Sequence, residues 1–160
     1  MSEGGEPIID VSSDQYFMGE ALREAMKAYR REEVPVGAVI VKDGQIIARA
    51  YNQVEMLQDA TAHAEMLCIT QAESVMEGWR LTDCTLYVTK EPCPMCAGAV
   101  VHARLSRVVF GLGDPKGGAA GGALNLLDFD GLNHKATVTS GVLQDECHQL
   151  IRAFFAERRG

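Results

Sequence analysis

The chain has 160 residues, of which 47% are apolar and 23% charged, and its net charge is -7. This length suits one compact domain, and the ordinary composition excludes disorder or a coiled coil over most of the chain. The acidic balance argues against a generic basic nucleic-acid coat protein, although it leaves room for local basic patches.

The first eleven residues are rich in glycine and acidic side chains and show no periodicity. We therefore expect a flexible tail over residues 1–11, followed by a single domain over residues 12–160. No apolar run approaches the roughly 20 residues that span a bilayer, and the start lacks the features of a secretion signal. A cytoplasmic protein without a membrane anchor is expected, in which five cysteines do not form a disulfide framework.

Hydrophobic periodicity predicts the elements in turn. Apolar residues at helical spacing predict a helix over residues 14–31, with Ser12, Ser13 or Asp14 as its cap. Two β-rich runs within residues 35–51 flank Asp43-Gly44 and predict a tight hairpin. Further helices are predicted over 62–77, 94–103 and 143–158, and strands over 85–89, 107–111 and 137–140.

The segment DPKGGAAGG, residues 114–122, holds four glycines and a proline and is predicted to be a loop. Around it, strands alternate with helices. This order predicts an α/β fold, a three-layer α/β/α sandwich with a mixed five-stranded sheet covered on both faces.

The stretch EPCPMCAGA places two cysteines three residues apart. Pro94 suits the first turn of a helix, so Cys93 is predicted at the N-cap and Cys96 in the first turn. The positive end of the helix dipole biases both sulfurs toward the thiolate. By itself this spacing fits a disulfide, a redox pair or half of a zinc site.

A second stretch, DATAHAEM, places His63 and Glu65 at another predicted helix start. Residues two apart point about 200° apart in mid-helix, so these side chains converge only on a site at the helix tip. If the two helix starts meet, His63, Cys93 and Cys96 supply three ligands for a tetrahedral zinc ion with one open position. An open position indicates catalysis, with Glu65 as a non-ligand that accepts the proton of an activated water.

The combination of H-x-E with P-C-x-x-C is the signature of zinc nucleobase deaminases. Residues 14–159 resemble the bacterial tRNA adenosine deaminases of the cytidine-deaminase-like superfamily. The resemblance rests on EVPVGAVIV, DATAHAEM, LYVTKEPCPMCAGAVVHARLSRVVFG, DPKGGAAGGALNLL, LNHKATVTSGVL and FFAERR. The zinc motif is typical of the superfamily, whereas the Gly-rich segment and the C-terminal FF-x-x-RR point to the tRNA branch.

The resemblance implies hydrolytic deamination of adenosine to inosine at the wobble position of tRNA anticodons. Zinc-activated water would attack C6 with Glu65 as proton shuttle, using one Zn²⁺ per subunit of a homodimer that binds the anticodon stem-loop. It further implies substrate contacts from Asn52, Val36, Ala64, His63 and residues 91–94 around the purine, from Asp114 and Lys116 beside the flipped nucleotide, and from Arg158 and Arg159 at the phosphates.

Two positions depart from the family pattern. Ala60 stands where the family usually has proline, which would loosen the approach to His63, and Gly121-Gly122-Ala123 replaces a commoner Gly-Ser pattern. The zinc motif itself is intact. The remaining histidines and cysteines are expected to be structural: His102, His134, His148, Cys68, Cys84 and Cys147.

Other functions fit part of the same pattern. A deaminase of free guanine, cytosine or nucleosides would keep the chemistry and change the substrate. A non-enzymatic RNA-binding module would use zinc for structure alone. A thioredoxin-like redox protein is disfavoured, because its C-x-x-C would follow a strand and would have no histidine partner such as His63.

Overall fold

The computed structural model describes residues 10–159, with the side chain of Arg159 left out of the description. In this part of the chain the strands form one sheet in the order β2-β1-β3-β4-β5. The strands are β1 Gly37–Lys42, β2 Gln45–Tyr51, β3 Cys84–Lys90, β4 Arg107–Leu112 and β5 Thr137–Thr139.

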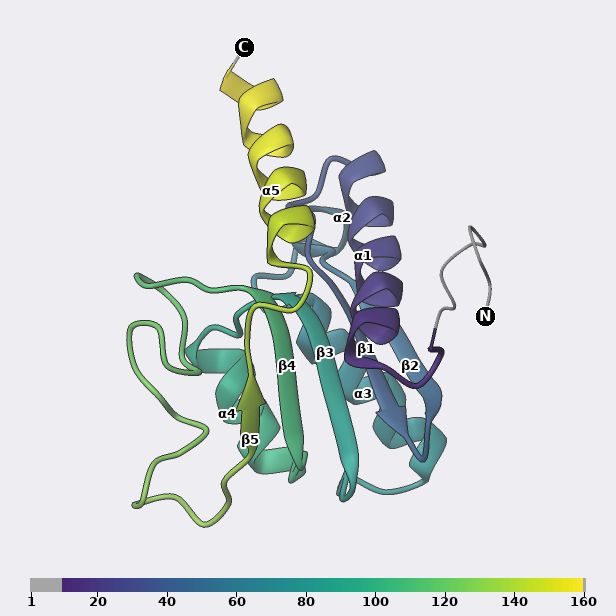
Figure 1. Ribbon diagram of the computed structural model, residues 1–160, viewed down its shortest axis with the longest axis vertical. Helices are drawn as coiled ribbons and strands as arrows, with labels where there is room; N and C mark the ends of the chain where they lie inside the picture. Colours follow the sequence, from purple (N-terminus) through teal and green to yellow (C-terminus); the bar gives the residue numbers. More distant parts are fainter. Residues whose placement is uncertain (1–9, 160) are drawn as a thin grey trace, which may run out of the picture.

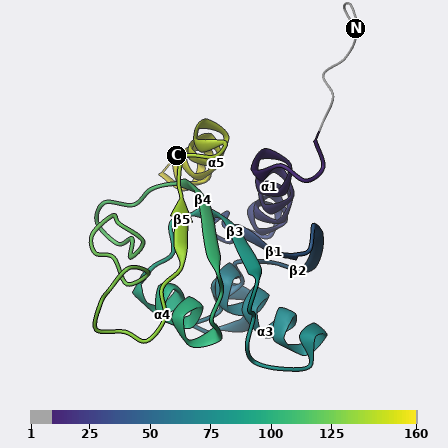
Figure 2. The same cartoon turned by 60° about the horizontal axis from the view of Figure 1, so that its bottom comes forward.

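Helices cover both faces of this sheet. They are α1 Asp14–Arg30, α2 Val54–Leu57, α3 Ala64–Met76, α4 Pro94–Ala103 and α5 Gln144–Arg159. Figure 2 shows α1 and α5 on one face and α3 and α4 on the other. The predicted three-layer α/β/α sandwich is confirmed.

The sheet is mixed, as expected. β1 runs antiparallel to β2 and to β3, whereas β3, β4 and β5 are parallel to one another. The β1–β2 hairpin turns at Asp43 and Gly44, whose φ angles of 51° and 76° are the positive values that such a tight turn requires. The sequence predicted this turn from the Asp-Gly pair.

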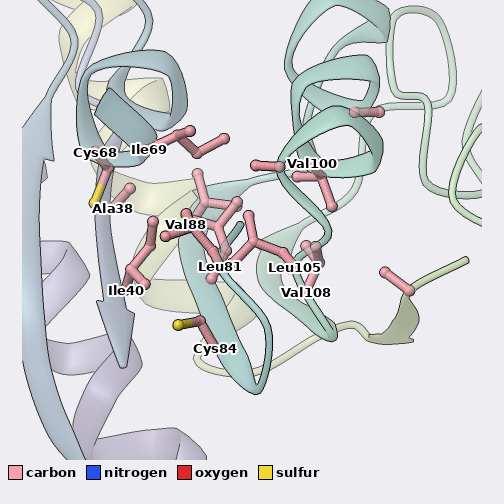
Figure 3. Packing of buried hydrophobic residues seen from close by; sticks show 14 of the residues in the cluster. Ala38, Ile40, Cys68, Ile69, Leu81, Cys84, Val88, Val100, Leu105 and Val108 are labelled. Atoms are coloured by element: carbon pink, nitrogen blue, oxygen red, sulfur yellow. The ribbon is translucent and has the colours of Figure 1, made fainter. Parts of the chain in front are cut away.

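Two apolar clusters hold the layers together. The larger lies between the sheet and the pair α3 and α4, where Ile40, Leu86 and Val88 meet Cys68 and Val100 (Figure 3). The smaller lies under α1 and the start of α5 and includes Phe17, Met18, Val39, Val109 and Cys147. Because helices bury both faces of the sheet, the sequences of β1 and β3 are nearly continuous apolar runs.

Gly37, at the start of β1, allows the sheet to approach α1 closely. A Cβ there would lie 2.1 Å from the carbonyl oxygen of Ala21, so any side chain would push the helix away. This contact packs the middle of α1 against the start of β1. In Figure 1, α5 extends beyond the sheet beside the end of α1, and this is where the cavity described below lies.

Three details differ from the prediction or lie beyond it. The four-residue helix α2 was missed, since one turn leaves no periodicity to read. The predicted flexible tail falls mainly on residues 1–9, which lie outside the described residues. Asp10 belongs instead to a turn in which its side chain accepts the backbone N–H of Ser12.

Among the described residues, no helix has the length and apolar character needed to cross a bilayer.

Candidate active site

Two helix starts meet at one point and carry the predicted metal ligands. α4 begins at Pro94 with Cys93 as its N-cap, as predicted, and Cys96 lies in its first turn. α3 begins at Ala64, so His63 is the N-cap and not a residue inside the helix. The expected convergence of the two tips is confirmed.

The three side chains fit a tetrahedral metal site. The Nδ1 atom of His63 lies 3.6 Å from the Sγ atom of Cys93 and 3.6 Å from that of Cys96. For zinc bound to one nitrogen and two sulfurs, ordinary bond lengths give a nitrogen–sulfur separation of about 3.6 Å. Among the described residues, this cluster is the group of His, Cys, Asp and Glu side chains whose spacing suits a metal ion. It is called the metal cluster below.

Without a cation, the two thiols of the metal cluster differ in acidity. Hydrogen bonds from Cys96 and His63 lower the pKa of Cys93 to about 3. The pKa of Cys96 is raised instead, through its hydrogen bond to Cys93 and through burial. The lowered pKa of Cys93 agrees with the expectation that the helix start favours the thiolate, while burial and the bond to Cys93 oppose this effect at Cys96.

Glu65 lies beside the metal cluster without belonging to it. Its side chain is buried on the first turn of α3. Burial raises the pKa of this carboxyl to about 7, against the opposing effect of its own backbone N–H. A carboxyl with a pKa near neutrality can both take up and release a proton, which a general acid–base group must do.

The metal cluster opens into a cavity of about 570 Å³, a volume typical of small-molecule sites. His63, Glu65 and Cys93 line it, and together with Cys96 they are called the floor of the cavity below. The other residues that line it are called its walls: Glu32, Glu33, Val34, Val36, Asn52, Val54, Glu55, Ala64, Lys90, Glu91, Asp114, Phe154, Phe155 and Arg158.

Asn52, predicted to contact the base, lies at the end of β2 and is buried. Its side-chain nitrogen donates to the carbonyl oxygen of Val34 at 3.2 Å, and its backbone N–H donates to that of Val36 at 3.0 Å. These bonds fix the orientation of the amide, so that its oxygen remains available as an acceptor. Val36 and Ala64, predicted beside the purine, also line the cavity.

The structure separates the two predicted residues of the Gly-rich segment, residues 114–122. Asp114 lines the cavity, accepts the backbone N–H groups of Lys116 and Gly117 at 3.0 Å each, and lies 3.4 Å from the ammonium of Lys90. These partners hold the pKa of Asp114 below its usual range, the N–H of Gly117 most strongly. The side chain of Lys116 is exposed and does not line the cavity.

The C-terminal helix forms another part of the wall. Arg158 donates to the carbonyl oxygen of Glu32 at 2.8 Å, and its guanidinium lies 4.0 Å from the ring centre of Phe154. This side chain thus connects α5 to the segment after α1, next to the cavity. The predicted contact from Arg159 falls on a side chain outside the description.

Sequence reasoning missed several lining residues. Glu33 is a buried carboxylate that accepts the backbone N–H groups of Glu55 and Met56 at 3.0 and 2.6 Å. Lys90, Phe154 and Phe155 also line the cavity. The FF pair was visible as part of an apolar helix face, but no sequence signal marks Glu33, because its partners lie more than twenty residues away.

The three cysteines expected to be structural are buried, as predicted. Cys68, Cys84 and Cys147 are buried free thiols, with pKa values raised by burial. His134 lies 2.7 Å from the carbonyl oxygen of Leu105, while His102 and His148 are exposed. Ala60 lies in a turn that the side chain of Asp59 and the bond from Gln53 N–H to the Ala62 carbonyl hold together, without a proline.

Comparisons with known proteins agree with this architecture. Residues 12–159 match the model of the MafB19-like deaminase family. The chain is 54% identical to the tRNA-specific adenosine deaminase of Bacillus subtilis (strain 168), over 93% of this chain and 92% of that one.

Two solved structures are also similar. One comes from biochemical and structural studies of A-to-I editing by tRNA:A34 deaminases at the wobble position of transfer RNA. It has a TM-score of 0.79 and 42% sequence identity, and the match covers 84% of this chain and 98% of that one. The other is a guanine deaminase from Bacillus subtilis, with a TM-score of 0.61, 41% identity and coverage of 63% and 65%.

The fold is that of the cytidine-deaminase-like proteins, as the family resemblance implied. Within this class, the chain belongs to the MafB19-like deaminase family and, by its identity to the relative from Bacillus subtilis, to the tRNA-specific adenosine deaminases.

Proposed function

We propose that this protein catalyses the hydrolytic deamination of adenosine to inosine at the wobble position of tRNA anticodons. The observation that carries the proposal is the metal cluster, with both nitrogen–sulfur distances at 3.6 Å, beside the buried carboxyl of Glu65 at the floor of an open cavity. The high identity to a tRNA-specific adenosine deaminase over nearly the whole chain supports the choice of substrate.

His63, Cys93 and Cys96 are the residues that would hold one Zn²⁺ per chain. Three protein ligands leave one position open, which distinguishes a catalytic site from the closed four-ligand structural sites. When bound, zinc lowers the pKa of water so that a nucleophile is available near neutral pH.

Glu65 moves the protons of the reaction. Its carboxylate accepts a proton from the attacking water, whose oxygen forms the new bond to C6 of adenine. The carboxyl then donates to N1, and a further proton transfer to the amino group lets the C6–N bond break and ammonia leave. Adenosine and water are thus converted into inosine and ammonia, and Glu65 returns to its starting state.

The cavity walls hold the base. Val36 and Ala64 supply apolar surface for the purine, and the side-chain oxygen of Asn52 accepts a hydrogen bond from it. Residues 91–94 complete the edge beside the metal cluster. Bases of an anticodon loop are already single-stranded, so turning one out into this cavity costs little.

RNA contacts outside the base come from two segments in this proposal. Asp114 and Lys116 lie beside the flipped nucleotide, and Arg158 and Arg159 meet backbone phosphates. The net charge of -7 implies that the RNA footprint is local and that binding weakens as salt increases. We further propose a cytoplasmic homodimer, in which residues 12–160 form a single catalytic domain.

The direct test uses purified protein and an anticodon stem-loop with adenosine at the wobble position. We expect one inosine at that position after sequencing, together with one ammonia per RNA. A stem-loop with adenosine moved elsewhere in the loop is the matched control and should react much more slowly.

Free guanine, cytosine and adenosine are incubated in parallel, since a guanine deaminase is among the similar structures. Ammonia from a free base and none from the RNA would mean that the substrate is the free base and not tRNA. RNA binding and zinc without any ammonia would instead indicate the non-enzymatic module.

A further inference from the structure

Glu91 is a buried carboxylate that binds the Gly-rich segment through backbone groups. It follows β3 directly, and its side chain is only 5% exposed. It accepts N–H groups from Asp114 at 2.8 Å, Ala120 at 2.9 Å and Gly122 at 2.8 Å. Three such bonds replace the hydration that a buried charge loses, and they gather both ends of the segment onto one side chain.

Two glycines of the segment lie so close to this carboxylate that a side chain would not fit. A Cβ on Gly118 would lie 2.2 Å from the carboxyl carbon of Glu91. A Cβ on Gly122 would lie 2.2 Å from the carbonyl oxygen of Asp114 and 2.7 Å from a Glu91 oxygen. Such distances are far below van der Waals contact, so the segment surrounds Glu91 only because these positions lack side chains.

The same stretch of chain leads into the metal cluster. Glu91 N–H donates to the carbonyl oxygen of Leu112, and the carbonyl oxygen of Pro92 accepts the N–H of Ala119, both at 2.8 Å. Cys93 comes next in the sequence. The backbone that presents a metal ligand is therefore tied to the end of β4 through Glu91 and to the Gly-rich segment through Pro92.

The Gly-rich segment also separates two cavities. Asp114 and Glu91 line the cavity above the metal cluster and also a second cavity of about 580 Å³, which Gly122 and Gln144 line on its other side. A displacement of Asp114 would change the lining of both cavities. What holds the segment in place therefore sets the lining of the space beside the metal cluster.

We propose that Glu91 is a positioning residue, which fixes the Gly-rich segment against the metal-ligand turn and so determines how the segment meets the nucleotide. This inference rests on the proposed function. Glu91 does not touch the reacting atoms in this proposal, and it acts through the three amides that it binds.

The test compares Glu91→Gln with wild type. An amide has one oxygen where the carboxylate has two, so it cannot accept all three N–H bonds. Ala120 and Gly122 both donate to Oε2, whereas Asp114 donates to Oε1, so an amide whose oxygen keeps the Oε2 position leaves the N–H of Asp114 without an acceptor. We expect the amide of Asp114 to exchange hydrogen about tenfold faster or more, with the zinc content unchanged. Catalytic efficiency on the stem-loop should fall about 10- to 100-fold, mainly through KM.

Glu24→Gln is the matched control. Glu24 is also a buried glutamate, 2% exposed, but its partners are the side chains of Lys27 and Arg49 on the far side of the molecule from the Gly-rich segment. Its substitution should lower stability and leave KM and the exchange of the Asp114, Ala120 and Gly122 amides unchanged.

Gly122→Ala disturbs the same contact from the side of the Gly-rich segment and keeps Glu91 intact. This variant tests the proposal even if Glu91→Gln does not fold. Its KM should rise while zinc is retained, and Gly19→Ala, where no atom lies within 4 Å of the added Cβ, should have no such effect. Combined with Glu91→Gln, it should add little, because both changes release one segment.

Unchanged protection of all three amides, those of Asp114, Ala120 and Gly122, in Glu91→Gln would overturn the proposal. So would loosened amides with an unchanged KM, or loss of zinc at normal protection, which would assign Glu91 to the metal cluster. Hydrogen exchange needs no substrate. It therefore decides whether Glu91 holds the segment even if wild type fails to deaminate RNA, a result that would overturn the proposed function instead.

Discussion

The floor and the walls of the cavity are built in different ways. At the floor, His63 and Cys93 are the N-caps of two helices, and Pro94 in the next position sets the start of one of them. In the walls, Glu33 and Glu91 are buried carboxylates that bind backbone amides more than twenty residues away along the chain. Local helix signals thus place the chemistry, whereas long-range polar contacts place the surfaces that recognise the substrate.

This difference separates two kinds of expected defect. Changes at the floor should remove metal or chemistry and leave recognition in place. Changes in the walls should alter KM and leave the metal and the chemical step in place. A third region, remote from the cavity, should affect stability alone.

Removing a ligand at the floor should have the largest effect. Cys96→Ala deletes one of the two sulfurs that lie 3.6 Å from His63, and the remaining pair cannot hold zinc at a tetrahedral site. We expect zinc affinity to fall by more than about a hundredfold and deamination to fall to background. Metal analysis and inosine formation measure both.

Cys68→Ala is the control for this ligand, because Cys68 is an equally buried free thiol outside the metal cluster. It should lose some stability through a small cavity and keep its zinc. Equal loss of zinc in the two variants would mean that packing, and not ligation, explains the result.

Glu65→Gln should have the next largest effect. The amide preserves the shape of the side chain and cannot shuttle a proton, so kcat should fall about 10²- to 10⁴-fold. Zinc content and RNA binding should remain close to those of wild type. Glu73→Gln, further along the same helix and outside the cavity lining, should be active. Substantial activity in Glu65→Gln would remove Glu65 from the mechanism.

Arg158→Ala tests the wall that α5 provides, with a smaller effect expected. The change removes the bond to the Glu32 carbonyl and the stacking on Phe154, so the end of α5 is held less firmly. We expect KM for the stem-loop to rise about 3- to 10-fold, with kcat and zinc unchanged. Arg152→Ala, an exposed arginine on the same helix, is the control. Equal effects would indicate general charge attraction and not a specific wall contact.

The sequence predicted the floor nearly completely for a physical reason. A proline after Cys93 and a capping position at His63 are local features, and converging helix tips are needed to explain the short H-x-E spacing. The strands β1 to β4 and the long helices were also predictable, since each contains enough residues to show its period. The helix α2 has four residues and shows none.

The walls were only partly predictable. Asn52, Val36, Ala64, Asp114 and Arg158 were named from the family resemblance, and all line the cavity. Lys116 does not, because the turn around Asp114 leaves its side chain exposed. The hydrogen bonds of Glu33 and Glu91 depend on the final fold of distant segments, and one sequence contains no pattern that reports such pairings.

The smallest effect is expected in the remote region, at Asp14 in the first turn of α1. Its carboxylate accepts two bonds from Arg107, at 2.9 and 2.7 Å, and one from the hydroxyl of Tyr87 at 2.8 Å. The bond with Arg107 is the main reason why the pKa of Asp14 lies below its ordinary value of 3.8. Because the folded state favours the charged form, this group contributes stability that is present above the unfolded pKa and is lost as pH falls through the folded pKa.

Asp14→Asn should therefore unfold about 1 kcal/mol more easily at pH 7, since the group is partly exposed and its bonds are only moderately strong. The difference from wild type should shrink as the pH is lowered through the folded pKa, as measured by denaturant unfolding at a series of pH values. Zinc content, kcat and KM should not change at neutral pH. A stability difference that persists unchanged in acid would remove the ion pair as its cause. A shift in KM would contradict the distinction between the cavity walls and the remote region, since a region outside the cavity would then take part in recognition.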